Sequence, residues 1–255
     1  MRHLFPPGPA IGLVGVVGLL TALHLVAGLG PRAWVVGLAS GVGLAVALTS
    51  GLLRAGRRSL LPADRVTLTR AVLACGVAAL VADAVRRPAA VDLLVGVASI
   101  ALALDAVDGW VARRTDTASP LGARFDMETD AFLILVLSVH VSRDLGWWVL
   151  GIGAARYVLL AVGIAGRWAP WLRGQVPSRR WRKVVAAYQG VALTVAAAQV
   201  LGDAVVTSVV AAGLALLLVS FGTEVVTLRM QSVGGAEPTA GLPLPLDATA
   251  ARAVQ

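Results

Sequence analysis

Residues 105–130 read DAVDGWVARRTDTASPLGARFDMETD and lie between two long apolar segments, with four of their five aspartates in two closely spaced pairs. Asp105 and Asp108 are spaced i,i+3, and Asp126 and Asp130 are spaced i,i+4, so on α-helices each pair shares one face. Carboxylates at membrane depth are costly unless a counter-charge compensates them. Two such faces turned together would form a cage of four carboxylates, which suits hard divalent cations with oxygen ligands. The stretch therefore predicts a site for Mg²⁺ or Mn²⁺, with two ions.

The composition of the chain is that of a membrane protein. Of its 255 residues, 58% are hydrophobic and only 14% are charged, which is too apolar for a soluble domain of this size. The net charge of +8 comes from short basic clusters without interleaved aromatic residues. This pattern argues against nucleic acid and favours membrane lipids and phosphate-bearing substrates as partners. The single cysteine, Cys75, lies in an apolar run, so we expect neither a disulfide nor a thiolate metal site.

Apolar segments of about 20 residues, the length that crosses a bilayer, recur eight times along the chain. They predict an all-α, polytopic membrane helix bundle. The expected spans are 10–30, 34–53, 66–85, 91–112, 125–142, 145–166, 184–201 and 204–228. Residues 1–53 would hold two N-terminal transmembrane helices, 54–65 a basic interfacial segment, and 66–230 a six-helix domain. The Ala-, Gly-, Pro- and Thr-rich tail 231–255 is expected to be disordered.

The basic residues predict the orientation of the bundle. If the spans alternate, 16 of the 22 Lys and Arg residues fall on one side of the membrane and four on the other, while Arg70 and Arg156 lie within spans. By the positive-inside rule, both termini are cytoplasmic. We therefore expect a multi-pass protein of the cell membrane with the aspartates at its cytoplasmic face.

The aspartate stretch resembles the signature of the CDP-alcohol phosphatidyltransferase family, DxxDGxxAR, eight residues, then GxxxDxxxD. All eight fixed positions match, namely Asp105, Asp108, Gly109, Ala112, Arg113, Gly122, Asp126 and Asp130. The resemblance covers about residues 62–229 and leaves the first two spans outside. It implies a homodimeric phosphotransferase of phospholipid biosynthesis, which moves a phosphatidyl group from a CDP-activated lipid, CDP-diacylglycerol, to a small alcohol with release of CMP.

The resemblance also implies roles for the aspartates. Asp105, Asp108 and Asp126 would be metal ligands, and Asp130 would complete the cage and act as the base that takes the proton of the acceptor hydroxyl. A two-metal site can neutralise bridging phosphates and stabilise charge on the departing oxygen.

Glycine and arginine positions of the signature point to the nucleotide. Gly109 lacks a side chain where a nucleotide must approach closely, and Arg113, one turn on, can fork onto a phosphate. Gly122 permits close packing near the start of the next helix.

The stretch PADRVTLTR, residues 62–70, resembles the first core helix of the family, which commonly opens with Pro-Asn and continues to a Thr and an Arg three residues later. Thr67 and Arg70 fit this pattern, whereas Asp64 stands where Asn is usual. The resemblance implies that Asp64, Thr67 and Arg70 contact the nucleotide or its phosphates. Arg70 lies inside the membrane and needs a partner, for which a phosphate or one of the aspartates would serve.

Basic residues further along the chain indicate the acceptor side of the cavity. Arg156 is a lone charge within a span, and either a substrate phosphate or a structural ion pair would satisfy it. The spacing of Lys183 to Gln189 is similar to that of phosphatidylglycerophosphate synthases, although Arg182 stands where a glycine is usual. We therefore expect Arg156 and Lys183 to bind an acceptor with its own phosphate, such as glycerol 3-phosphate. An inositol phosphate, serine or another alcohol remains open.

Other interpretations of the same residues compete with the enzyme. The carboxylates could form the cation site of an ion or solute transporter, although they lie at one membrane face and no internal repeat is evident. A scaffold would keep the fold without the chemistry. Glu128 is expected to have a supporting or solvated role, and His24 and His140 to be packed or hydrogen-bonded rather than catalytic.

Overall fold

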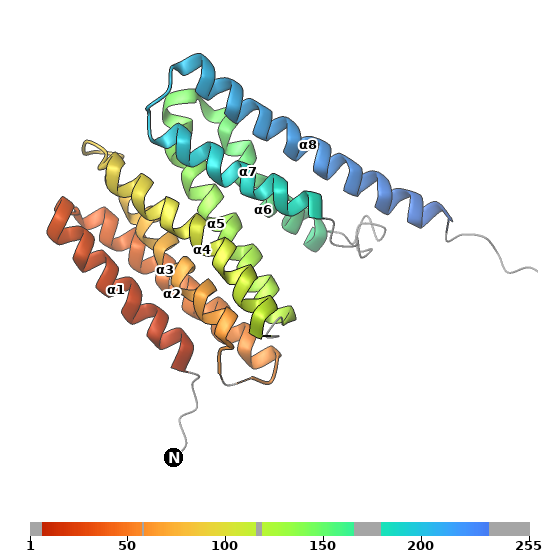
Figure 1. Ribbon diagram of the computed structural model, residues 1–255, viewed down its shortest axis with the longest axis horizontal. Helices are drawn as coiled ribbons and strands as arrows, with labels where there is room; N and C mark the ends of the chain where they lie inside the picture. The colour runs from red at the N-terminus through yellow and green to blue at the C-terminus, as the bar shows by residue number, and fades with distance from the viewer. Residues whose placement is uncertain (1–6, 58, 116–118, 166–179, 235–255) are drawn as a thin grey trace, which may run out of the picture.

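The computed structural model describes residues 7–57, 59–115, 119–165 and 180–234, and some side chains within these ranges lie outside the description. Throughout these ranges the regular structure is helical. The α-helices are α1 (Pro7–Ala27), α2 (Pro31–Arg54), α3 (Pro62–Asp83), α4 (Val91–Thr115), α5 (Pro120–Leu145), α6 (Leu150–Ala165), α7 (Arg180–Ala197) and α8 (Asp203–Gly234) (Figure 1). A short 3₁₀ helix, η1 (Trp147–Val149), joins α5 to α6.

The helices follow the eight expected spans in order, so the all-α prediction is confirmed for the described ranges. The helices α1, α2 and α3, together with Asp203–Thr223 of α8, are long and apolar enough to cross a membrane. The helix α6 has 16 residues, and the apolar part of α7, Lys183–Ala197, is also short. The division into two accessory helices and a six-helix domain remains a prediction. The helix α8 continues past the expected boundary at 230 to Gly234, and the rest of the predicted tail, 235–255, lies outside the described residues.

Local sequence explains where several helices begin and end. Pro31, Pro62 and Pro120 occupy the first turns of α2, α3 and α5, where a missing N–H costs nothing. Ser119 caps α5 by accepting a hydrogen bond from the Gly122 amide at 3.0 Å, as short hydroxyl side chains do at helix N-termini. At the end of α2, Gly56 has a φ of +63°, a conformation that glycine adopts without steric cost.

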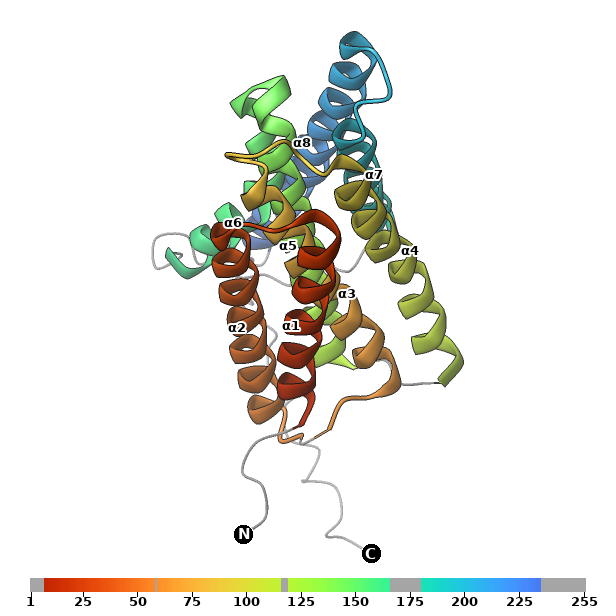
Figure 2. The same ribbon diagram turned by 90° about the vertical axis from the view of Figure 1, so that its left-hand side faces the viewer.

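The helix α3 lies at the centre of the bundle and packs against α1, α2, α4 and α5. Its buried positions include the small residues Ala74, Cys75, Ala78 and Ala79, which let helix backbones approach closely in lipid. Figure 2 shows α1 and α2 side by side on one face of the bundle, and both contact α3. The helices α1 and α2, called the accessory pair below, are therefore packed directly onto α3, the helix that carries Arg70.

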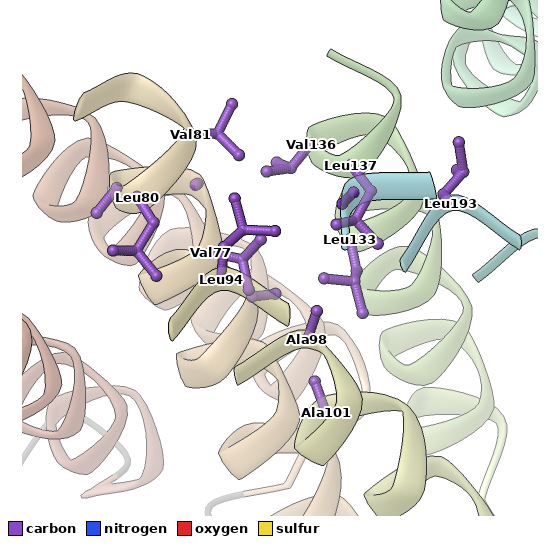
Figure 3. Close-up of a cluster of buried hydrophobic side chains, with 14 of the residues drawn as sticks. Val77, Leu80, Val81, Leu94, Ala98, Ala101, Leu133, Val136, Leu137 and Leu193 are labelled. Atoms are coloured by element: carbon purple, nitrogen blue, oxygen red, sulfur yellow. The ribbon is translucent and has the colours of Figure 1, made fainter. Parts of the chain in front are cut away.

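The main core draws on all the helices, and its part nearest the aspartates lies between α3, α4, α5 and α7. Figure 3 shows Val77 of α3, Leu94 of α4, Leu137 of α5 and Leu193 of α7 in this cluster, and each is at most 1% exposed. Between membrane helices such interlocking packing supplies much of the association energy, because lipid is as apolar as the side chains. The core fixes the relative placement of α3, α4 and α5, which carry the aspartates and Arg70.

Large apolar side chains also cover the outward faces of several helices. Ile11 and Leu25 of α1 are 64% and 81% exposed, and Leu218 of α8 is 63% exposed. Water would penalise such surfaces, whereas lipid tails would not. These faces support the assignment of the chain to the membrane.

Candidate active site

Aspartates of α4 and α5 converge on Arg70 of α3, which is 1% exposed. The guanidinium Nη1 lies 3.0 Å from Oδ1 of Asp105 on α4, and the same group donates hydrogen bonds to Asp126 and Asp130 on α5. Its Nε donates to the carbonyl oxygen of Ala101, one turn before Asp105, at 3.2 Å. One side chain from α3 thus joins the two helices that carry the aspartates.

The local sequence explains why this junction forms. Asp126 and Asp130 lie one turn apart on the same face of α5, as their i,i+4 spacing predicts. A guanidinium is planar and has five N–H donors, so it can contact carboxylates on two sides at once. Arg70 is therefore the type of residue that can serve all three carboxylates from one position.

The carboxylates are close enough together to ligate a cation. One oxygen from each of Asp105, Asp126 and Asp130 can be chosen so that these atoms all lie within 4.8 Å of one another. This donor set consists of oxygen alone, which is the preference of Mg²⁺ and Mn²⁺. The Arg70 contacts use Oδ1 of each carboxylate, and each carboxylate has a second oxygen. Cation ligation is therefore compatible with the arginine contacts.

The charge balance also favours a cation. Three ionised carboxylates and one guanidinium carry a net charge of −2, and the addition of Asp108 would make it −3. An uncompensated charge of this size is costly at membrane depth. These residues fit a hard divalent cation, whereas the identity and number of ions remain predictions.

Four more signature residues lie on α4 beyond Asp105, and three of them have predicted roles at the site. Asp108, Gly109 and Arg113 all belong to this helix. The side chains of Asp108 and Arg113 lie outside the described residues. The metal-ligand role of Asp108 and the phosphate contact of Arg113 therefore remain predictions, as does the close approach of a nucleotide to Gly109.

The predicted nucleotide residues of α3 share one buried face. Asp64, Thr67 and Arg70 follow each other at intervals of three, and they are 1%, 2% and 1% exposed. The Thr67 hydroxyl donates to the Ala63 carbonyl at 3.3 Å. The sequence predicted that Arg70 contacts either a phosphate or an aspartate, and in the structure it contacts the aspartates. Contact of this face with a nucleotide remains a prediction.

Asp64 lies where the first turns of α3 and α5 meet. Its Oδ2 accepts a hydrogen bond from the Leu61 amide at 2.9 Å, while its buried Oδ1 has no hydrogen-bond partner among the described residues. A Cβ at Gly122 would lie 2.5 Å from this Oδ1 and 3.1 Å from Oγ of Ser119. The close packing expected at Gly122 is therefore present, and its neighbour is Asp64.

Arg156 on α6 forms an ion pair with Glu128 on α5. Nη2 lies 2.6 Å from Oε1, and Nε donates to Oε2 at 3.4 Å. Both side chains are partly exposed, at 24% and 36%. The structural ion pair that the sequence left open is thus formed, and it gives Glu128 a partner. Binding of an acceptor by Arg156 remains a prediction.

Lys183 lies in the first turn of α7, a helix that packs against α4 and α5. It is exposed and interacts electrostatically with Asp126. Gln189, further along α7, is 4% exposed, and its Nε2 has no hydrogen-bond partner in the described part of the chain. Binding of an acceptor by Lys183 remains a prediction.

The two histidines of the apolar spans lie away from the aspartates. His24 forms a hydrogen bond through Nδ1 with the Leu29 carbonyl at 3.0 Å. His140 is ten residues beyond Asp130 on α5, which corresponds to about 15 Å along the helix, and it lines a cavity of about 230 Å³ with Arg143 and other residues. This cavity therefore lies near the C-terminal end of α5, whereas Asp126 and Asp130 lie nearer its N-terminal end.

Comparison with known proteins identifies the family. The model of the CDP-alcohol phosphatidyltransferase family matches residues 60–222, which is more than half of the chain. The chain belongs to the CDP-alcohol phosphatidyltransferase family. As such it is a phosphotransferase that moves a phosphatidyl group from a CDP-alcohol to an alcohol. No match was found among curated proteins or among solved structures.

The matched region of this CDP-alcohol phosphatidyltransferase begins just before α3 and ends within α8. The helices α1 and α2 therefore lie outside the matched part of the chain, as the sequence predicted. The aspartates, Arg70 and the pair formed by Glu128 and Arg156 all lie inside it.

Sequence reasoning missed two residues near the site of this phosphatidyltransferase. Ser119 was not singled out, although Ser followed by Pro is a recognisable helix start. Arg57 was treated as one member of a basic interfacial segment, whereas its Nη2 lies 3.1 Å from Oδ2 of Asp64. No local pattern identifies that contact, because it depends on how the end of α2 turns toward α3.

Proposed function

We propose that the protein transfers the phosphatidyl group of CDP-diacylglycerol to a small alcohol and releases CMP, in a reaction that depends on Mg²⁺ or Mn²⁺. The observation that supports this most strongly is the convergence of Asp105, Asp126 and Asp130 around the buried Arg70. Three carboxylates with one counter-charge suit a site that receives cations together with anionic phosphates.

The proposed step is a substitution at phosphorus. The oxygen of the acceptor hydroxyl forms a bond to the phosphatidyl phosphorus, and the bond from that phosphorus to the CMP oxygen breaks. CMP leaves with the electron pair, and Asp130 takes the hydroxyl proton. Divalent cations held by Asp105, Asp108, Asp126 and Asp130 would supply charge neutralisation at the phosphates.

Other residues of the chain would bind the CDP group. Arg113, on the helix of Asp105, would fork onto a phosphate, and Gly109 would leave room for the nucleotide. Asp64, Thr67 and Gly122 would form the other wall. Arg70, buried behind the aspartates, would hold them in place for the cations and the phosphates.

The acceptor is proposed to carry a phosphate of its own, as glycerol 3-phosphate does. Lys183 supports this proposal, because an exposed cation that interacts electrostatically with Asp126 could bind an anionic acceptor near the proposed base. Arg156 could contribute if its pair with Glu128 opened or accepted a third partner. Such a protein would be a multi-pass homodimer of the cell membrane with cytoplasmic termini, and the lipid would reach the site from the bilayer.

The test is CMP formation by the purified protein from CDP-diacylglycerol, with Mg²⁺, Mn²⁺ or EDTA and a panel of alcohols. The panel contains glycerol 3-phosphate, an inositol phosphate, serine and glycerol. We expect metal-dependent CMP formation with a phosphorylated acceptor. CMP formation with serine or glycerol alone would reject the proposed acceptor. Cation flux into proteoliposomes without CMP formation would reject the transferase and favour the transporter.

A further inference from the structure

The end of α2 is joined to the starts of α3 and α5 by Arg57. Its Nη2 donates to Oδ2 of Asp64 at 3.1 Å and to the Ser59 carbonyl at 3.2 Å, and its Nη1 donates to Oγ of Ser119 at 3.3 Å. Arg57, Asp64 and Ser119 are called the Arg57 network below. Arg57 lies outside the region that the family model matches, 60–222, whereas its two side-chain partners lie inside it.

The backbone at the end of α2 fixes the position of Arg57. The Arg57 amide donates to the Leu52 carbonyl at 2.9 Å, and the Gly56 amide donates to the Leu53 carbonyl at 3.1 Å. With Gly56 at positive φ, this is a Schellman motif, which reverses the chain direction after a helix. Arg57 is therefore held by α2 rather than by a free loop.

Asp64 needs the cation that Arg57 supplies. Its side chain is only 2% exposed, and a buried carboxylate without a counter-charge is strongly unfavourable. The Leu61 amide supplies one hydrogen bond, and Arg57 is the only cation that forms an ion pair with Asp64 among the described residues. Loss of Arg57 would leave a buried charge directly beside Gly122.

The network lies at the base of the helices that carry the active site. On α3, Asp64 precedes Arg70 by six residues, or about 9 Å of helix rise. On α5, Gly122 precedes Asp126 by one turn. A shift between the two helix starts would therefore alter the position of Arg70 relative to the α5 aspartates.

Apolar packing at the same end supports the connection. Leu48 and Leu52 of α2 form a separate buried cluster with Leu68 and Ala71 of α3 and Phe125 of α5. Phe125 is adjacent to Asp126 in sequence. At the other end of the accessory pair, the Gly30 amide donates to Asp83 of α3 at 2.8 Å. The accessory pair is thus fastened to α3 at both ends.

We propose that α2 is part of the active-site framework and that Arg57 is a positioning residue, which neutralises Asp64 and sets α3 against α5 at the nucleotide end of the site. This proposal rests on the proposed function for its effect on catalysis. It gives the accessory helices a role, because without α2 there would be no anchor for Arg57.

The experiment compares Arg57→Ala, Asp64→Asn, the double variant and Arg57→Lys, with Arg54→Ala as the matched control. Arg54 is an exposed residue in the last turn of α2, so its loss removes the same charge from the same end of the helix. Three quantities are measured in detergent: the unfolding midpoint, the KM for CDP-diacylglycerol and the KM for the acceptor.

We expect Arg57→Ala to lower the unfolding midpoint by about 3 °C and to raise the KM for CDP-diacylglycerol on the order of tenfold, without a matching change in the KM for the acceptor. In the Asp64→Asn background the same change should have little effect, because no buried charge remains to be neutralised. Arg57→Lys should recover part of the loss in unfolding midpoint and part of the rise in the KM for CDP-diacylglycerol. It also supplies the comparison if Arg57→Ala does not fold.

The proposal is overturned if Arg57→Ala behaves like Arg54→Ala in its unfolding midpoint and in its KM for CDP-diacylglycerol. It is also overturned if the effects of Arg57→Ala simply add to those of Asp64→Asn. An equal rise in both KM values would also overturn the positioning role at the nucleotide end. If the wild-type protein forms no CMP, the proposed function fails. The unfolding midpoints of the four Arg57 and Asp64 combinations then still decide whether the network couples α2 to α3.

Discussion

Nη1 of Arg70 lies 3.0 Å from Oδ1 of Asp105, and this contact joins α3 to α4 at the point where α5 presents Asp126 and Asp130. The arginine is buried while the three carboxylates are 42%, 30% and 29% exposed. The positive charge therefore lies behind the carboxylates, which leaves their other sides open to ligands. Such an arrangement holds the carboxylates in place before a cation binds, which reduces the cost of assembling the site.

Replacement of Arg70 should damage both stability and activity. Arg70→Lys keeps the charge but cannot reach Asp105, Asp126 and Asp130 together, because an ammonium is a single point charge. We expect the free energy of unfolding to fall by about 3 kcal/mol, the lower end of the range for a broken buried pair. CMP formation should fall on the order of 100-fold.

The control for Arg70→Lys is Arg65→Lys, an exposed position on the same helix. Thermal unfolding in detergent and CMP formation are measured for both. Equal behaviour of the two variants would show that Arg70 does not organise the carboxylates.

Divalent cations should stabilise the protein in the absence of substrate. Because they bind the folded carboxylate site, Mg²⁺ or Mn²⁺ at 100 times the dissociation constant should add about 2.7 kcal/mol to the free energy of unfolding. The unfolding midpoint should rise with cation concentration and return with EDTA.

Asp126→Asn should remove most of that cation-dependent rise, whereas Asp203→Asn should retain it. Asp203 begins α8 and does not belong to the group of candidate ligands. A rise that persists in Asp126→Asn would place the cation elsewhere.

Gly122→Ala should disrupt the meeting point of α3 and α5. The new Cβ would lie 2.5 Å from Asp64 Oδ1, closer than atoms pack, and the buried carboxylate has little room to move. We expect a loss of about 1–3 kcal/mol of stability, as for other overpacked sites, with a raised KM for the CDP-lipid.

Gly96→Ala on α4 is the matched control, because no atom lies within 4 Å of a Cβ added there. This change should be neutral or stabilising by about 0.4–1 kcal/mol. If thermal unfolding shows that Gly122→Ala is tolerated as well as Gly96→Ala, the contact with Asp64 is not a constraint.

The pair formed by Glu128 and Arg156 can be separated into structural and acceptor roles. A partly exposed ion pair contributes only about 0–1 kcal/mol, so Glu128→Gln and Arg156→Ala should lower the unfolding midpoint slightly and equally if the pair is structural. If Arg156 also binds the acceptor phosphate, Arg156→Ala should raise the acceptor KM on the order of tenfold more than Glu128→Gln. Equal KM values for both variants would remove Arg156 from the acceptor site.

The sequence predicted those features that depend on local spacing. Helix periodicity places Asp126 and Asp130 on one face, and apolar run length predicts the helices to within a few residues. The rule that membrane charges need partners predicted that Arg70 would contact a phosphate or an aspartate. It did not predict that one guanidinium contacts three carboxylates, because that depends on how α3 packs between α4 and α5.

Contacts between helix ends were also beyond local reasoning. The partner of Arg156 was left open between a substrate phosphate and a structural ion pair, since both satisfy the same chemistry, and Glu128 was not identified as its partner. The contact of Arg57 with Asp64 depends on a turn at Gly56 and on the packing of α2 against α3. Such contacts are decided by tertiary packing, which a single sequence does not reveal.

The central claim is that the carboxylates around Arg70 carry out metal-dependent phosphatidyl transfer. The most direct test is the rate of CMP release from CDP-diacylglycerol and the best acceptor, with Mg²⁺ or Mn²⁺, for the wild-type protein, Asp130→Asn and Asp203→Asn. The account predicts release that is abolished by EDTA, reduced at least about 1000-fold in Asp130→Asn and unchanged in Asp203→Asn. Release that survives EDTA, or an Asp130→Asn variant as active as the wild type, would contradict it.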